Sequence, residues 1–388
     1  MKITSQLLFG TELQLTAACI VFALINPAPA QTWTLTSAPS GNWSSIASSA
    51  DGTRLAATIK SGGIYISTNS GATWTLSGAP SKGWYSVAAS ASGSNLVATA
   101  DGIYTSTNMG AAWSFRTNLM SLESVASSAD GIKLVAAAWG PGYVYTSTNA
   151  GATWQKTTAP EGYWTSVASS ADGSGLMVGY GGYVYISTNS GATWIQKAPG
   201  SSSAAAVAVA FSADKNTVVW AAGGGSQRGG IYVSTNTGAK WITNTVSGSG
   251  LSSVALSADG RQMVALDGGT FLTSTNSGTS FTNGSDPGVP LKFITASADG
   301  SSLAAVVSGG GIYTLHSIPS PQLNFTPSPT NFILAWIVPS KNFVLQQSPD
   351  LVSWWSVTDT PALDLTNLNN KVSVSLSNSS RFYRLATP

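Results

Sequence analysis

The octapeptide STNSGATW stands at Ser67–Trp74 and is repeated without change at Ser187–Trp194. Close variants are STNMGAAW from Ser106, STNAGATW from Ser147, STNTGAKW from Ser234 and STNSGTSF from Ser274. The six copies are separated by 39, 41, 40, 47 and 40 residues and end at Trp74, Trp113, Trp154, Trp194, Trp241 and Phe281. Such a period indicates an array of similar supersecondary units.

Each unit contains four short segments with alternating apolar residues. In the first unit, SSIASSA, RLAATIK, GIYISTN and ATWTLS are separated by Asp51-Gly52, a glycine-rich bend and the octapeptide turn. This pattern predicts four antiparallel strands, and four strands in about 40 residues are typical of a β-propeller blade. First strands are expected at seven positions, which predicts seven blades: Ser44, Tyr85, Glu123, Thr165, Val207, Ser252 and Lys292.

The amino-terminal segment resembles a fourth strand. QTWTLTSAP at Gln31–Pro39 nearly repeats ATWTLSGAP at Ala72–Pro80, whereas the seventh unit ends after its third strand, GIYTLH. We therefore expect the amino-terminal strand to complete the seventh blade, which removes the exposed edges of an open array. The predicted fold is all-β: a seven-bladed β-propeller closed by the N-terminal strand, followed by a small β-sandwich-like C-terminal domain.

Composition divides the chain into four parts. Residues 1–30 contain Lys2, an apolar stretch at Leu15–Ile25 and the sequence Ala28-Pro29-Ala30, which predicts a signal peptide and a secreted protein, extracellular or periplasmic. The alternative is an uncleaved membrane anchor, but the apolar run is shorter than the roughly 20 residues of a spanning helix. Residues 31–317 form the propeller, 318–331 a Pro-rich linker and 332–388 a small β domain. This last part resembles compact carboxy-terminal modules of secreted bacterial proteins.

Charged residues are scarce, at 8% of the chain, and the formal net charge is +2. With no basic run, the sequence argues against nucleic acid or an anionic membrane as a partner. The only cysteine, Cys19, lies in the predicted signal peptide, and the only histidine, His316, precedes the linker, so we expect no disulfide, metal site or cofactor. After signal cleavage we expect a monomer without a transmembrane anchor.

The octapeptide resembles the BNR or Asp-box repeat, S-x-D-x-G-x-T-W, with asparagine in the Asp position. The resemblance covers residues 31 to about 317. Proteins with such repeats include sialidases, sortilin-type receptors, xyloglucan-degrading enzymes and a photosystem II assembly factor. The resemblance therefore implies a propeller and leaves the activity open.

We interpret the box as a structural turn. An Asn side chain can bond to backbone amides two residues on, Gly71 can take a positive φ, and Trp74 can pin the turn against the next blade. A calcium site is disfavoured because no box contains a carboxylate. The structural box residues are Ser67, Asn69, Gly71, Trp74, Asn108, Trp113, Asn149, Trp154, Asn189, Trp194, Asn236, Trp241 and Asn276. Recurring carboxylates before or near glycine are also explained as turn residues: Asp51, Asp130, Asp172, Asp214, Asp259 and Asp299.

Strand order places the boxes and the Asp-Gly turns on one face, here called the lower face, and the variable loops mainly on the other, the upper face. Aromatic residues cluster near the upper face and are the predicted binding residues for carbohydrate or protein: Trp84, Trp139, Tyr143, Tyr163, Trp164, Tyr180 and Tyr183. The alternative for the tryptophans at first strands, Trp43 included, is packing between blades. Apolar residues occupy the equivalent position in other units: Leu122, Ala206, Leu251 and Leu291.

Catalysis has weak support in the sequence. Glycoside hydrolysis usually needs two carboxylates about 5–10 Å apart, and Glu123 with Glu161 is the best candidate pair, the alternative being two solvated charges. A sialidase is disfavoured because the propeller's few arginines cannot readily converge. The sequence therefore favours a non-catalytic binding or scaffolding protein, with an extracellular glycoside hydrolase as the alternative. A third possibility is a spacer that displays the carboxy-terminal module.

Overall fold

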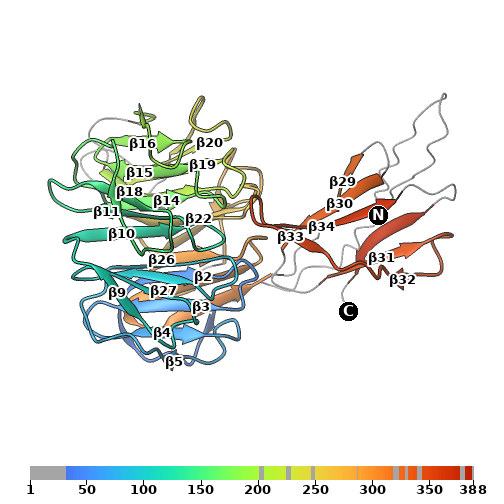
Figure 1. Ribbon diagram of the computed structural model, residues 1–388, viewed down its shortest axis with the longest axis horizontal. Helices are drawn as coiled ribbons and strands as arrows, with labels where there is room; N and C mark the ends of the chain where they lie inside the picture. The colour runs from blue at the N-terminus through green and yellow to red at the C-terminus, as the bar shows by residue number, and fades with distance from the viewer. Residues whose placement is uncertain are drawn as a thin grey trace.

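The computed structural model describes residues 32–200, 205–223, 229–245, 250–285, 287–317, 323–327, 331–338, 343–375 and 381–386. The predicted signal peptide, with Cys19, lies outside the described residues. The described residues contain β-strands, turns and bends and no helix (Figure 1). Among them there is accordingly no helix with the length and apolarity needed to cross a bilayer.

Five four-stranded antiparallel sheets follow one another along the chain, each with its strands in sequence order. The first two are β6 (Ser86–Ala89), β7 (Leu96–Thr99), β8 (Ile103–Ser106), β9 (Ser114–Thr117) and β10 (Leu122–Ser127), β11 (Leu134–Ala138), β12 (Val144–Ser147), β13 (Gln155–Lys156). The next are β14 (Ser166–Ser169), β15 (Leu176–Tyr180), β16 (Tyr183–Ser187), β17 (Ile195–Lys197) and β18 (Ala205–Phe211), β19 (Val218–Gly223), β20 (Gly230–Ser234), β21 (Ile242–Thr245). The last is β22 (Leu251–Leu256), β23 (Met263–Asp267), β24 (Thr270–Ser274), β25 (Thr282–Asn283).

The two ends of this domain meet in a further sheet of eight strands. Its strands are β1 (Thr34–Leu35), β2 (Gly41–Ser48), β3 (Leu55–Ile59), β4 (Ile64–Ser67), β5 (Thr75–Leu76), β26 (Leu291–Ala296), β27 (Ser302–Gly310) and β28 (Ile312–His316). Strand β1 pairs antiparallel with β28, and β2 pairs with β27 near Gly41. The amino-terminal residues therefore lie beside residues almost 300 positions later in the chain, as in the register Thr34↔Thr314.

The second strands of the repeats are largely buried. All described residues of β7, β11, β19 and β23 are buried. These strands lie between the first and third strands of their sheets, and both of their faces pack against neighbouring sheets. Burial on both faces explains why they read as continuous runs of Ala, Val and Leu instead of alternating.

Seven alanines at the lower ends of the first strands form a cycle of backbone hydrogen bonds, here called the alanine ring. Each N–H donates to the carbonyl oxygen of the next member, at 2.6–3.2 Å, and Ala298 donates back to Ala50. The members in the described residues are Ala50, Ala91, Ala129, Ala171, Ala213, Ala258 and Ala298. A cyclic arrangement of four-stranded sheets around such an axis is a β-propeller.

The octapeptide turns and the turns after the first strands share the lower face. The backbone N–H of Ser70 in the first box donates to Thr53 O in the preceding turn, at 2.8 Å. Equivalent bonds join Met109 to Ser94, Ala150 to Ile132, Ser190 to Ser174, Thr237 to Asn216 and Ser277 to Arg261. The loops between second and third strands therefore lie on the opposite, upper face.

The carboxy-terminal residues form a separate pair of sheets. One has β29 (Asn324–Pro327), β30 (Asn331–Ile337), β34 (Asn369–Ser375) and β33 (Ala362–Asp364), and the other has β32 (Trp355–Ser356), β31 (Val344–Ser348) and β35 (Phe382–Ala386). Buried residues of both sheets, among them Leu334, Trp336, Leu345 and Tyr383, pack into one core. Strand β29 lies within residues 318–331, where the sequence predicts a Pro-rich linker. It is an edge strand, where Pro327 costs no ladder hydrogen bond.

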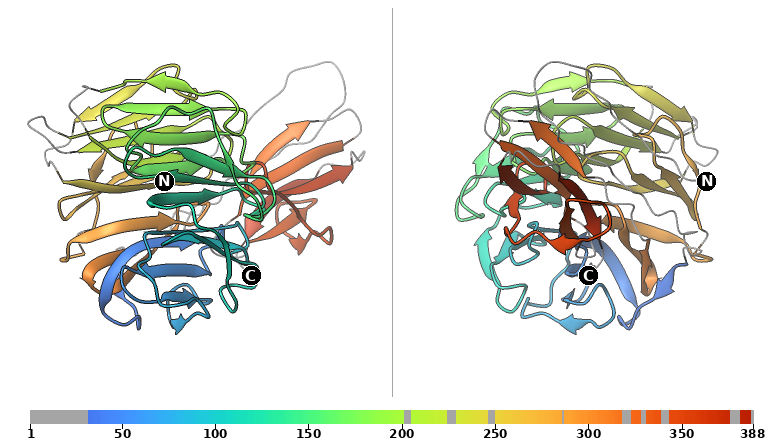
Figure 2. Two further views of the ribbon diagram at one scale, coloured as in Figure 1. Left: turned by 60° about the vertical axis from the view of Figure 1, so that its left-hand side comes forward. Right: turned by 90° about the vertical axis from the view of Figure 1, so that its right-hand side faces the viewer.

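This carboxy-terminal module lies against the lower face, at the axis. Ile337, Val338 and Leu368 pack on the alanine ring, and Val338 N–H donates to Leu368 O at 2.9 Å. Figure 2, right, looks onto this face and shows the module in front of the ring of blades. The module therefore lies over the lower end of the axis, where a cavity of about 170 Å³ is lined by the alanine ring and Leu368.

Candidate functional site

The octapeptide is held by side-chain bonds inside the turn. In the first copy, Ser67 Oγ donates to Asn69 Oδ1 at 3.0 Å and accepts from the N–H of Gly71 at 2.9 Å. The same Ser-to-Asn bond occurs in the other five copies. Ser70 and Gly71 have φ of 57° and 89°, so the turn needs two successive left-handed residues, and glycine takes the second position without strain.

Two details of the box differ from expectation. Asn69 Oδ1 accepts the N–H of Thr73, four residues on instead of two, at 2.8 Å. Trp74 packs into the core formed with β27 and β28, and Trp113 into the core that contains Ile66, so each box ring contacts the preceding blade, not the next. The glycine of the turn lies against the preceding blade as well, as Gly238 lies against Ile186.

A related turn in the carboxy-terminal module escaped the sequence search. Ser348 Oγ donates to Asp350 Oδ1 at 3.0 Å, and Trp354 Nε1 donates to Leu351 O at 3.2 Å. These bonds match the Ser-to-Asn bond and the bond from Trp74 Nε1 to Gly71 O. SPDLVSW is one residue shorter than the octapeptide and lacks its glycine, which is why the pattern did not reveal it. Leu351 takes the left-handed conformation instead, at φ 64°.

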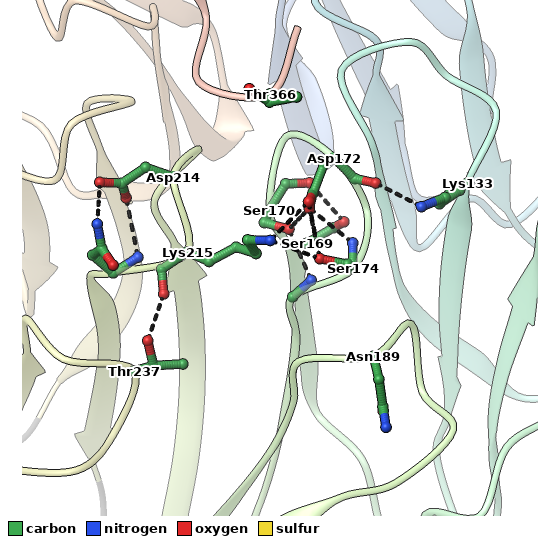
Figure 3. Close-up of polar contacts among 12 residues, drawn as sticks. Lys133, Ser169, Ser170, Asp172, Ser174, Asn189, Asp214, Lys215, Thr237 and Thr366 are labelled. Atoms are coloured by element: carbon green, nitrogen blue, oxygen red, sulfur yellow. Dashed lines mark hydrogen bonds and ion pairs between the residues drawn. The ribbon is translucent and has the colours of Figure 1, made fainter.

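The recurring aspartates of the lower face cap their own turns. Each accepts a hydrogen bond from the hydroxyl of the serine two residues before it, as from Ser49 to Asp51 at 2.6 Å and from Ser170 to Asp172 at 2.7 Å. The Asp172 carboxylate also accepts a hydrogen bond from Lys215 Nζ of the next blade at 2.8 Å (Figure 3). Burial opposes the charge on Asp172, but the bonds from Lys215 and the Ser174 N–H outweigh it and hold its pKa far below the usual value.

This carboxylate makes the stability of the propeller depend on acidity. Its folded pKa is lowered, so its contribution is complete above the unfolded pKa, about 3.9, and declines as the pH falls from there towards the folded value. We expect Asp172→Asn to lower the free energy of unfolding at pH 7 by roughly 1–2 kcal/mol, a moderate figure because Lys215 is 38% exposed. Urea unfolding at pH 7 and pH 3 should show this difference shrinking in acid.

Asp130→Asn is the matched control. Asp130 occupies the same turn position and accepts from Ser128 and the Ile132 N–H, and among the described residues no lysine bonds to its carboxylate. A loss for Asp172→Asn no larger than for Asp130→Asn would contradict the role given to Lys215.

The first-strand tryptophans do not reach the surface. Trp84 and Trp164 are both 0% exposed, and Trp43 is 1% exposed. They pack with the edges of neighbouring tyrosines, Trp84 on Tyr104 at 5.1 Å and Trp164 on Tyr185 at 5.4 Å between centroids. The prediction that Trp84 and Trp164 contact a ligand is therefore wrong, because ring closure places this position between two blades.

Three other predicted aromatics form a cluster on the upper face, here called the aromatic shelf: the exposed Trp139 and Tyr163 and the half-buried Tyr180. Trp139, after β11, is 51% exposed, and Tyr163, before β14, is 45% exposed. The Tyr163 ring meets Trp139 edge-on at 5.9 Å and stacks on Tyr180 at 6.0 Å. Two blades therefore contribute to one continuous aromatic surface.

Tyr143 and Tyr183 lie near the shelf with other partners. The Tyr143 hydroxyl donates to Glu161 Oε2 at 2.8 Å, which raises the pKa of Tyr143, and Lys156 Nζ lies 3.1 Å from the centre of its ring. Tyr183 begins β16 and pairs with Tyr180 across the hairpin. Both side chains are half-buried, so they support the shelf more than they extend it.

A cavity of about 270 Å³ lies at the upper end of the axis, here called the axial cavity. It is formed where the first strands begin, and several of these strands have a register shift at this point, as between Leu122 and Ser124 and between Leu291 and Phe293. A bulge re-aims the side chain of the extra residue. The charged residues of the lining are Lys60, Glu123 and Lys292, and its other polar residues are Asn42, Ser44, Ser45, Tyr85, Ser86, Ser124, Thr165, Ser166, Ser252 and Ser253.

Serine hydroxyls join neighbouring blades inside this cavity. Ser45 Oγ accepts the N–H of Val87 at 3.2 Å, and Ser124 Oγ accepts that of Val167 at 3.1 Å. Equivalent bonds involve Ser86, Ser166 and Ser253. An accepting hydroxyl still carries a proton that it can donate, so several first strands present hydroxyl groups to the cavity.

The structure does not bring Glu123 and Glu161 into one cavity. Glu123 lines the axial cavity, where partial burial raises its pKa and the Lys60 ammonium opposes this shift. Glu161 lies outside that lining and bonds to Tyr143. Among the described residues that line the cavity, Glu123 is the only carboxylate. Within the described part of the chain, no group of three or more His, Cys, Asp or Glu is arranged to hold a metal ion.

Comparisons with known proteins show the fold. No protein family and no curated protein matches the sequence. Among solved structures, YCF48 from Cyanidioschyzon merolae is 16% identical with a TM-score of 0.57, over 74% of this chain and 98% of that one. YCF48 bound to D1 peptide is 15% identical with a TM-score of 0.58, over 76% and 98%.

An ancestral GH74 enzyme is 16% identical with a TM-score of 0.59, over 83% of this chain. This chain spans 52% of that enzyme. At these identities the shared feature is the β-propeller fold, and the fold by itself assigns no activity.

Proposed function

We propose that this protein is a secreted, non-catalytic β-propeller of the Asp-box type that binds carbohydrate through its upper face. The observation that carries the proposal is the aromatic shelf: two exposed rings in mutual contact, contributed by two blades, beside a hydroxyl-lined cavity. Sugar rings stack on exposed aromatic faces, and hydroxyl groups orient them. The six box turns and the predicted signal peptide support the family and the secreted location.

We further propose that the propeller has seven blades and is closed by β1. The proposal is supported by the seven members of the alanine ring and by the pairing of β1 with β28. The carboxy-terminal module packs on the lower end of the axis. The aromatic shelf and the axial cavity lie on the upper face, which we propose as the face offered to a ligand.

Catalysis is not part of the proposal. A glycoside hydrolase usually needs two carboxylates about 5–10 Å apart, and the described lining of the axial cavity has Glu123 alone. If the protein cleaved polysaccharide, new reducing ends would appear and would disappear in Glu123→Gln. Reducing ends would be measured in the same solutions as binding.

Removing the most exposed ring of the shelf tests the proposal. We expect Trp139→Ala to weaken oligosaccharide binding about tenfold or more, since a truncated aromatic contact of this kind is worth about 1–2 kcal/mol or more. The free energy of unfolding should change by less than about 0.5 kcal/mol because the ring is on the surface. Isothermal titration calorimetry with a panel of neutral and acidic oligosaccharides measures the binding.

Trp355→Ala is the control for this experiment, because Trp355 is similarly exposed, at 46%, but belongs to the carboxy-terminal module. It should leave the affinity unchanged. Saturable binding that Trp139→Ala does not weaken would contradict the shelf. Binding of peptides and of no sugar would indicate a protein ligand instead, as in the structure of YCF48 bound to D1 peptide.

A further inference from the structure

The axial cavity has a charge asymmetry that the aromatic shelf does not share. Lys292 is the second residue of β26. The N–H of Lys60 donates to Asn42 O at 2.9 Å, which holds Lys60 beside the start of β2. Strands β2 and β26 contact each other across the junction of the last and first blades. The two lysines of the lining therefore come from the junction of the last and first blades, and Glu123 comes from the blade that begins with β10.

We propose that the axial cavity binds the carboxylate of an acidic sugar residue, with Lys60 and Lys292 as its cationic partners. The inference rests on the proposed carbohydrate-binding function and names the class of sugar. The described lining carries two ammonium groups against one carboxylate, so its net charge favours an anionic group. In a concave site with protein walls, such an excess acts on a ligand more strongly than on an open surface.

The remaining wall suits a sugar. Thr165, Ser44 and Ser252 contribute hydroxyl groups, Asn42 an amide, and Glu123 can accept a hydrogen bond from a ligand hydroxyl. The volume, about 270 Å³, is near the lower limit of the roughly 300–1,000 Å³ of small-molecule sites. The cavity therefore fits a single sugar residue with a polar, hydroxylated surface better than a bulky apolar side chain of a peptide.

Only a few backbone residues separate the shelf from this cavity. Trp139 N–H donates to Ser121 O at 2.7 Å, two residues before Glu123. Tyr163 likewise stands two residues before Thr165 of the lining. Two extended residues span only about 7 Å, so one oligosaccharide can place a ring on the shelf and the next acidic residue in the cavity.

The test compares the acid and methyl-ester forms of one ligand. Trigalacturonate and its methyl ester are titrated calorimetrically into the full chain, with sialyllactose as a second source of sugar carboxylate. We expect trigalacturonate, sialyllactose or both to bind. The acid form should bind roughly tenfold tighter than its ester or neutral counterpart, and this difference in affinity should diminish with added salt. In the double variant Lys60→Gln with Lys292→Gln, the preference should be lost.

Lys240→Gln is the control, because Lys240 is an exposed lysine of a lower-face box; it should keep the preference. Circular dichroism of the double variant should match the unaltered protein, since both lysines are exposed. Equal affinities for acid and ester, or a preference that survives the double variant, would overturn the inference. If Trp139→Ala still abolished binding in that case, the proposed function would stand without it.

Two further outcomes also count against the inference. Lysine-dependent binding of a hexaglutamate peptide, without binding of either acidic sugar, would assign the cavity to an acidic peptide. Absence of saturable binding to every neutral and acidic sugar would remove both the inference and the proposed function.

Discussion

Deleting residues 32–38 is expected to lower the free energy of unfolding by about 3–5 kcal/mol and to promote aggregation. The deletion removes β1 and its pairing with β28, together with the bond from Thr36 N–H to Ile312 O at 2.9 Å. It also removes Trp33, whose ring meets Phe271 edge-on at 5.2 Å and whose Nε1 donates to Ser285 O. The edge of β28 would then be open to pairing with other molecules.

Urea unfolding followed by circular dichroism measures this loss, and light scattering measures the aggregation. The control is the double variant Thr34→Ala with Leu35→Ala, which alters two exposed side chains but keeps the backbone pairing. It should lose much less stability than the deletion. If the deletion protein unfolded at the same urea concentration as the intact chain, β1 would have no part in closing the propeller.

The second large effect is expected from Trp84→Ala, which should lower the free energy of unfolding by about 3–5 kcal/mol. Trp84 is 0% exposed and lies in the core between the first two blades, where it contacts Tyr104 and Trp113. Truncation leaves a cavity that close-packed neighbours cannot fill. Urea unfolding compares it with Trp139→Ala, which removes an equally large but exposed ring and should cost less than about 0.5 kcal/mol.

These two tryptophans separate structure from binding. If Trp84→Ala left stability unchanged and instead abolished ligand binding, the assignment of the first-strand position to the core would be wrong. If Trp139→Ala destabilised the protein as much as Trp84→Ala, the shelf would be a structural cluster. The pair of variants should therefore be measured together, for stability and for binding.

Local turn chemistry was predictable from the sequence because it depends on neighbours in the chain. The Ser, Asn and Gly of each octapeptide specify a turn with two left-handed residues, and the structure has this turn at every copy. The aspartates before glycine cap their own turns in the same way. The spacing between turns then leaves room for strands of two to nine residues, which predicts blades of an all-β propeller.

Exposure was not predictable, because it depends on which blades become neighbours. Trp84 and Trp139 are both tryptophans beside upper-face loops, yet one is in the core and the other on the surface. In other units Leu or Ala stands at the position of Trp84, which indicated a buried position, whereas Trp139 has no such equivalent. For the same reason the box tryptophans pack on the preceding blade, which no single repeat could reveal.

By itself the sequence determined the repeating hairpins, their turns and the class of fold, since hydrogen bonds within about eight residues decide these features. Only the tertiary structure decided where the chemistry lies. The axial cavity takes its lining from first strands spread between Asn42 and Phe293, and the carboxy-terminal module covers the opposite end of the axis. Groups so far apart in the chain come together only when the ring of blades closes, because closure fixes their distances and their contact with solvent.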